Sequence, residues 1–276
     1  MASDCVREAA LRETSTGSLP QALGLAASGE LVSIVGGGGK STLLFALGRA
    51  LPGRTVLTTT TRIFRSQLEL AERHCSYTAD GFEAALETEN GLLVVGEIAG
   101  EKAQGVPLGL PTRILRTDGI DHVVIEADGS RMRPTKAPAE HEPAVPAETT
   151  LLVVVAGIDA LADTLARSCH RPERASEITG VALDQRLTPA HLAGLLCHHR
   201  GGLKGAPAGA RRIILLNKVE RAQQRVLARE VADEILRRDR VERVVIGALD
   251  PGGGQGGTNR RIGQPGTLRI LQRAGG

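Results

Sequence analysis

Residues 31–47 read LVSIVGGGGKSTLLFAL. The apolar run that opens this stretch is typical of a buried strand, and the leucines that follow the glycines recur with helical spacing. Glycines let the backbone turn tightly, so that successive N–H groups point inward, and the next helix adds its positive N-terminal end. The stretch therefore predicts a strand, a phosphate-binding loop and a helix.

This predicted phosphate loop supplies most of the expected site. We expect Lys40 to reach the β- and γ-phosphates of ATP or GTP and the Ser41 hydroxyl to bind Mg²⁺. The full signature has a glycine where this chain has Ile34, and the shortened form resembles the loop of the Mur-ligase group of ATP-dependent enzymes. The alternative is a glycine-rich turn with an incidental lysine, as in a dinucleotide fold. The loop residues are Gly36, Gly37, Gly38, Gly39, Lys40, Ser41 and Thr42.

Apolar runs and helical patterns alternate along the rest of the chain. This alternation predicts an α/β fold, a P-loop NTPase-like three-layer sandwich with a mainly parallel central sheet. We divide the chain into a lead-in (1–28), the nucleotide-binding domain (29–250) and a flexible glycine-rich tail (251–276). The further predicted strands are Thr55–Thr59, Leu92–Val95, His122–Glu126, Leu151–Val155, Ile213–Leu216 and Val244–Ile246. The predicted helices are Ser41–Ala50, Ala79–Glu89, Ala160–Arg167, Pro189–His199 and Glu220–Arg238.

Composition argues against several classes of partner. The chain has 276 residues, of which 41% are hydrophobic, but only 1% are aromatic, and its formal charge is +3. Single-stranded nucleic acids are bound by stacking on aromatic rings, so we expect no nucleic-acid partner. No apolar run approaches the ~20 residues of a membrane helix, and the N-terminus does not resemble a secretory signal. The four cysteines form no CxxC pair, which favours reduced thiols and a cytoplasmic protein.

The apolar run at His122–Glu126 ends in one acid, Glu126, and a second acid, Asp128, follows two residues later. Acids at such a strand end hold Mg²⁺ or orient the attacking water in phosphate-loop enzymes. We expect Asp128 to hold Mg²⁺ and Glu126 to orient water, with the reverse order left open. The cations Arg131 and Lys136 come next and suggest an anion site, the alternative being a solvated loop whose charges satisfy one another.

Two other segments are candidate nucleotide contacts. Thr60 and Arg62 follow the second predicted strand, where they would sense the γ-phosphate unless the segment is only a strand edge. Asn217, Lys218 and Glu220 resemble the NKxD element of guanine-nucleotide proteins, with Glu in place of Asp. The alternative is an ordinary helix start with an acid in its first turn, so guanine is only weakly favoured over adenine.

The chain resembles the YqeC family. The motifs GGGGKST, TTTTRIF, VVIEADGSRMRPTKAPAEHEP, HRPE, GGLKGAP and LLNKVE occur in the family's order between Leu31 and Ile246. The family is described as accessory proteins of selenium-dependent molybdenum hydroxylases, so the resemblance implies a client hydroxylase or its cofactor as partner. The pattern IEADG also looks like the IExxG strand end of metallocentre-maturation GTPases.

Cysteines and histidines offer a competing interpretation. Cys169-His170 and Cys197-His198-His199 would form a soft-metal site if the two segments met. The alternative for the second group is a helix end, where His is favourable and glycine follows. His170 and Arg171 belong to the HRPE motif and are candidate phosphate or partner contacts.

Three functions are compatible with these motifs. The leading hypothesis is a Mg²⁺-dependent nucleoside triphosphatase that acts as a maturation factor, with loops at 58–62 and 131–136 that switch on hydrolysis. The second is a transferase or ligase acting on a small molecule such as a pterin cofactor. The third is a nucleotide-binding scaffold without chemistry.

Overall fold

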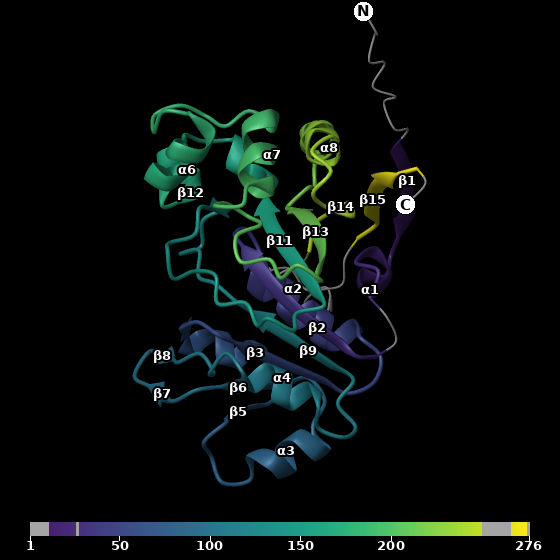
Figure 1. The fold of residues 1–276 in the computed structure, drawn as a ribbon, viewed down its shortest axis with the longest axis vertical. Helices are drawn as coiled ribbons and strands as arrows, with labels where there is room; N and C mark the ends of the chain where they lie inside the picture. Colours follow the sequence, from purple (N-terminus) through teal and green to yellow (C-terminus); the bar gives the residue numbers. More distant parts are fainter. Residues whose placement is uncertain (1–10, 26–27, 250–265, 275–276) are drawn as a thin grey trace, which may run out of the picture.

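The structure, a computed structural model, describes residues 11–25, 28–249 and 266–274. Within these ranges, ten strands form one central sheet (Figure 1). Their spatial order is β1 (Leu11–Thr16), β15 (Leu268–Arg273), β14 (Arg243–Ile246), β13 (Arg211–Asn217), β11 (Leu151–Gly157), β2 (Glu30–Gly36), β9 (His122–Glu126), β3 (Thr55–Thr59), β6 (Leu92–Val95) and β5 (His74–Ser76).

The sheet is parallel from β14 to β5, and β15 runs antiparallel to both of its neighbours. Helices cover both faces, which confirms the predicted three-layer α/β sandwich. They are α1 (Leu19–Ala22), α2 (Lys40–Ala50), α3 (Phe82–Thr88), α4 (Leu110–Leu115), α5 (Leu165–Ser168), α6 (Pro172–Thr179), α7 (Pro189–Cys197) and α8 (Ala222–Leu236), with 3-10 turns η1 (Arg65–Leu70) and η2 (Ile158–Leu161).

Alternating side chains of β2 belong to two separate cores. Val32 and Ile34 pack with α1 and α2, whereas Leu31 and Val35 pack with α3, α4, α7 and α8. Successive residues of a strand point to opposite faces, so a continuous apolar run is what a strand covered on both faces requires. Burial of these apolar side chains holds the helices against the sheet. None of the described helices has the length and apolarity to cross a membrane.

Strand order determines where the candidate site lies. β9 is inserted between β2 and β3, so the acidic strand end lies directly beside the phosphate loop. The register pairs Ile34 with Glu126 and Glu126 with Thr59. On the other side, β11 pairs Val155 with Gly36. Parallel strands end at the same edge, which therefore brings the phosphate loop and the acidic strand end together.

Two smaller sheets lie outside the central one. β10 (Thr135–Lys136) pairs in parallel with β12 (Cys169–His170), which brings the HRPE motif to the loop after β9. β4 (Ile63–Phe64), β8 (Lys102–Ala103) and β7 (Ile98–Ala99) form the other, beyond β3.

The structure adds elements that the sequence analysis did not predict. The lead-in contains β1 and α1, and the tail contains β15, whose Leu268 and Ile270 are buried in the core. Residues 268–273 are thus part of the central sheet and not of a flexible tail; most of the glycine-rich stretch, 250–265, lies outside the described residues. The predicted helix Ala160–Arg167 is divided into η2 and α5.

Candidate functional site

The loop between β2 and α2 has a conformation that only glycine adopts readily. Gly36, Gly38 and Gly39 have φ angles of 102°, 73° and 133°. A Cβ on Gly36 would lie 2.2 Å from the carbonyl oxygen of Val155, so a larger residue would also collide with β11. The run of glycines is therefore a requirement of backbone shape and close packing.

Lys40 opens α2 and meets both predicted carboxylates. Its Nζ donates to the Gly36 carbonyl at 2.9 Å and lies 3.5 Å from Asp128 Oδ1 and 3.7 Å from Glu126 Oε1. All three charged side chains are buried. The structure thus brings together the three residues predicted as catalytic, although their roles stay predictions.

Ser41 pairs with Glu126 and not with Asp128. Its hydroxyl donates to Glu126 Oε2 at 2.8 Å and accepts from Gln67 Nε2 at 2.7 Å. Burial raises the pKa of Glu126, while the charge of Lys40 and the Ser41 hydrogen bond lower it less strongly. Gln67 lies on η1, and no sequence motif pointed to it.

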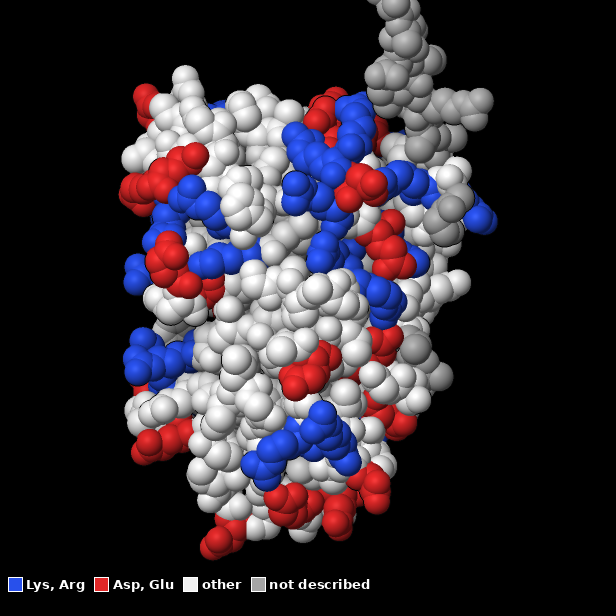
Figure 2. All heavy atoms as spheres, viewed as in Figure 1, with Lys and Arg blue, Asp and Glu red and all other residues white. Residues whose placement is uncertain are grey.

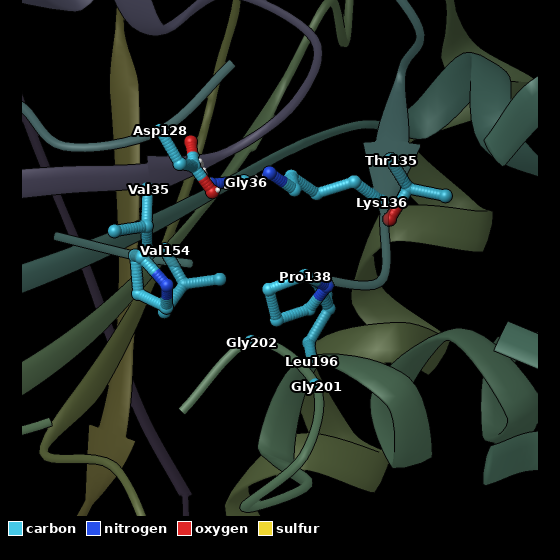
Figure 3. A pocket seen from close by; sticks show the side chains of 11 residues that line it. Val35, Gly36, Asp128, Thr135, Lys136, Pro138, Val154, Leu196, Gly201 and Gly202 are labelled. Carbon is cyan, nitrogen blue, oxygen red and sulfur yellow. Dashed lines mark hydrogen bonds and ion pairs between the residues drawn. The ribbon is translucent and has the colours of Figure 1, made fainter. Parts of the chain in front are cut away.

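Asp128 is held against the back of the loop. Both carboxylate oxygens accept from the Gly36 N–H at 3.1 Å, and Oδ2 lies 3.1 Å from Lys136 Nζ. Figure 3 shows Asp128 and Lys136 pointing toward one another with Gly36 beside them. A carboxylate therefore already accepts from one of the amides expected to bind phosphate.

Two more loop amides have acceptors within the chain. Gly37 N–H donates to Val155 O at 2.9 Å, and Gly38 N–H donates to Arg133 O at 3.0 Å. Residues 133–135 lie so close that a Cβ on Gly37 would be 2.5 Å from Arg133 O. The first turn of α2 is different, because the N–H groups of Lys40, Ser41 and Thr42 have no intrahelical acceptor.

A chain of ion pairs leads away from Asp128. Lys136 Nζ contacts Glu142 Oε2 at 2.8 Å, and Arg171 Nη1 contacts the same oxygen at 2.7 Å. Burial alone would raise the pKa of Glu142, but its hydrogen bonds to Lys136 and Arg171 lower the pKa to about 2. Burial and these cations lower the pKa of His170 to about 4. Glu142 lies in the AEHEP part of the family motif, and the sequence predicted no role for it.

A small cavity separates this network from the apolar interior. It measures about 10 Å³ and is lined on one side by Gly36, Asp128 and Lys136, and on the other by apolar groups such as Val154 and Pro138 (Figure 3). That is about the space of one water molecule. The cavity is therefore too small to hold a triphosphate.

Three of the expected phosphate contacts lie apart from this cluster. The Thr60 hydroxyl donates to Ala144 O at 2.7 Å. Arg62 and Arg131 are exposed, and within the described ranges no hydrogen bond or ion pair joins either to the phosphate loop. Arg131 has a φ angle of 49°, which is unusual for a residue with a side chain.

The LLNKVE segment contacts the phosphate loop through Asn217. Asn217 is buried; its Nδ2 donates to Gly38 O at 2.9 Å, and its Oδ1 accepts from Leu249 N–H at 2.9 Å. Lys218 pairs with Asp159 at 2.7 Å, while Glu220 is exposed. Asn217 therefore connects the phosphate loop with the segment that follows β14, a role that the motif did not predict.

The cysteine and histidine segments have other surroundings. Cys169 lies on β12 beside the ion-pair chain, and Cys197 ends α7; burial raises their pKa values to about 12 and 11. Among the described residues, no group of three or more His, Cys, Asp or Glu side chains is placed to hold a metal. The soft-metal interpretation gains no support from this arrangement.

Comparison with known proteins agrees with the distinctive part of the sequence. The family described as "YqeC protein" matches residues 32–173, which span β2, the phosphate loop, β9 and the ion-pair chain. The uncharacterised protein YqeC of Escherichia coli (strain K12) is 30% identical over 224 residues, covering 79% of this chain and 87% of that protein. This chain belongs to the YqeC family.

Proposed function

We propose that this chain binds a nucleoside triphosphate together with Mg²⁺ and hydrolyses it. The observation that carries the proposal is the convergence of the Lys40 ammonium and the Ser41 hydroxyl on two buried carboxylates at the start of α2. An ammonium group binds the β- and γ-phosphates, and the unpaired N–H groups of a first helical turn bind further phosphate oxygens. Neither the ammonium group nor the helix N-terminus would specify a ligand by itself.

The donor set fits Mg²⁺, which prefers oxygen ligands. Ser41 and Glu126 are 2.8 Å apart, so we assign these two residues to the metal. Asp128 is then the carboxylate that positions water or responds to the phosphates, which is the reverse of the order preferred from the sequence. Bound Mg²⁺ would neutralise charge on the transferred phosphoryl group.

The proposed reaction needs few protein groups. The water oxygen forms a bond to the γ-phosphorus while the bond to the bridging oxygen breaks, and the products are a nucleoside diphosphate and inorganic phosphate. The proton of the attacking water leaves through a carboxylate to solvent. Lys40 stabilises the negative charge that develops on the phosphate oxygens.

Nucleotide binding would have to move the segment at 131–135. Gly38 N–H now donates to Arg133 O, and Gly36 N–H donates to Asp128. Phosphate oxygens would compete for both donors, so binding would free the segment from the loop. Such a switch suits an accessory or maturation factor, and the YqeC resemblance implies a molybdenum hydroxylase or its cofactor as the client.

A transferase or ligase acting on a pterin-type cofactor is the second candidate. The exposed cation Arg131 favours it, because a guanidinium group on the surface can meet an anionic acceptor. Turnover only with a cofactor precursor present would support this function. Binding without turnover under either condition would indicate a nucleotide-binding scaffold.

The deciding experiment is titration of ATP and GTP, each with and without Mg²⁺, with phosphate release measured in parallel. We expect Mg²⁺-dependent binding that weakens at least about tenfold in Lys40→Ala, the scale of one lost charged hydrogen bond. Ser41→Ala should reduce Mg²⁺ dependence more than nucleotide affinity. Lys102→Ala, which removes an exposed cation on β8, is the control. Equal binding by the wild type and Lys40→Ala would overturn the proposal.

A further inference from the structure

A second, larger cavity lies among α6, α7 and α8, with none of its lining residues in the phosphate loop. Its volume is about 560 Å³, within the range of small-molecule sites. Figure 2 shows that Lys and Arg side chains gather on the part of the surface where Figure 1 places α8. The polar lining comes from His191, His198, His199, Arg238 and Arg240.

Cations outnumber acids around this cavity. Glu234 pairs with Arg237 at 2.7 Å and with Arg238 at 2.9 Å, so one carboxylate serves two guanidinium groups. Among the described residues, Arg240 takes part in no ion pair. The lining thus contains no carboxylate, one guanidinium group paired from outside the lining, Arg238, and one that takes part in no ion pair among the described residues, Arg240.

The histidines add to this arrangement. The ring centroids of His198 and His199 are 4.4 Å apart. His198 Nδ1 accepts from the Arg200 N–H at 3.1 Å, so in the neutral ring Nε2 carries the proton and is a donor. Arg200 itself is paired with Glu177 at 2.9 Å. Burial lowers the pKa of His198, and the charges of His199, Arg200 and Arg240 lower it further.

We propose that this cavity binds a small phosphorylated compound, with its phosphate at Arg240 and the two histidines. Guanidinium groups bind phosphate through paired hydrogen bonds, and several cations around one cavity favour a dianion over a single carboxylate. Ile178, Gly194 and Cys197 line the apolar part and would contact the uncharged body of the ligand. A hollow of this size fits one small molecule and not an extended nucleic-acid backbone.

One short segment, residues 196–202, contributes to the lining of both cavities. Leu196, Gly201 and Gly202 line the small cavity behind Gly36, whereas Cys197 to His199 line this one. Neighbouring residues at the C-terminal end of α7 therefore line two different cavities. This inference does not depend on nucleotide hydrolysis, since none of its residues belongs to the proposed catalytic cluster.

The test uses inorganic pyrophosphate and the imidazole NMR signals of His198 and His199, assigned with single His→Gln variants. We expect pyrophosphate to shift both signals and to raise the pKa of His198, because a bound anion favours the protonated ring. The charged groups that face the ring are His199, Arg200 and Arg240, with His191, Arg238, Glu177 and Glu234 in the surrounding helices.

Variants separate this site from the phosphate loop. Arg240→Gln should weaken the binding of pyrophosphate, read from the histidine shifts, about tenfold or more. Gly194→Leu should fill the cavity with its side chain, and the backbone should accept the change because a Cβ at this helical position meets no atom within 4 Å. Lys40→Ala should leave the histidine shifts intact, as should the control Arg225→Gln at the other end of α8. Shifts that disappear in Lys40→Ala, that persist in both cavity variants, or that are absent in the wild type would each overturn the proposal.

Discussion

Lys136 is a buried cation that contacts two carboxylates. Its side chain is 2% exposed and contacts Asp128 at 3.1 Å and Glu142 at 2.8 Å. Lys136→Met keeps most of the volume but leaves both carboxylates without this partner. We expect a loss of about 3–5 kcal/mol in the free energy of unfolding, measured by urea denaturation. Lys102→Met, at an exposed site, should cost less than about 0.5 kcal/mol; equal losses would contradict the assignment.

Glu142 should make stability depend on pH. Its folded-state pKa of about 2 lies below the ordinary value of 4.5, so its stabilising effect is complete above pH 4.5 and is lost as the pH falls toward 2. Solvent screening at this half-buried group reduces the effect to about 1–2 kcal/mol. The stability difference between wild type and Glu142→Gln should shrink by more than half between pH 6 and pH 3 in chemical unfolding. A difference independent of pH would contradict the ion-pair chain.

The sequence was sufficient to bring Lys40, Glu126 and Asp128 together. Glu126 ends the buried strand β9, Asp128 follows it, and Lys40 opens the helix after β2, so the common edge of a parallel sheet places them side by side. Gln67 and Glu142 could not be predicted, because Gln67 lies on η1 after β4 and Glu142 lies in the segment after β10, and the paths of both segments depend on tertiary packing. Asn217 was recognised for its motif, but its hydrogen bond to Gly38 depends on strand order.

The loop between β2 and α2 should tolerate no added methyl group. A Cβ on Gly38 would lie 2.3 Å from the Gly157 nitrogen, and its φ angle of 73° disfavours any side chain. Gly38→Ala should therefore cost more than the ~1 kcal/mol typical of a positive-φ glycine, as measured by thermal unfolding. Gly209→Ala, where a Cβ meets no atom within 4 Å, should be close to neutral. A tolerated Gly38→Ala would mean that the loop is not packed against β11.

At the level of helices and strands, continuous apolar runs were reliable and short amphipathic ones were not. Each run between Leu31 and Ile246 became a strand, because its residues are covered on both faces. β15 was missed since only Leu268, Ile270 and Leu271 are apolar and a glycine-rich stretch precedes them. The predicted helix at Ala160–Arg167 is interrupted where Thr164 bridges to Arg186.

The whole fold relies on residues close to both ends of the chain. β15 lies between β1 and β14, and Leu268 is fully buried. Leu268→Ala should reduce the free energy of unfolding by about 2–5 kcal/mol, as for other buried leucines. Arg269→Ala, which removes only an exposed ion pair with Glu13, should cost less than about 1 kcal/mol. Chemical denaturation of both variants measures these losses. A neutral Leu268→Ala would contradict the burial of Leu268 in the core.

The pairing of β1 with β15 also suits the chain to circular permutation. Leu11 lies opposite Arg273, so the described ends of the polypeptide meet at one margin of the sheet. A short peptide joining them, with new termini opened between Ala208 and Gly209, would give a circular permutant that keeps every strand in place. Because that opening lies on the surface and outside the proposed sites, the permuted protein should fold and bind the same ligands.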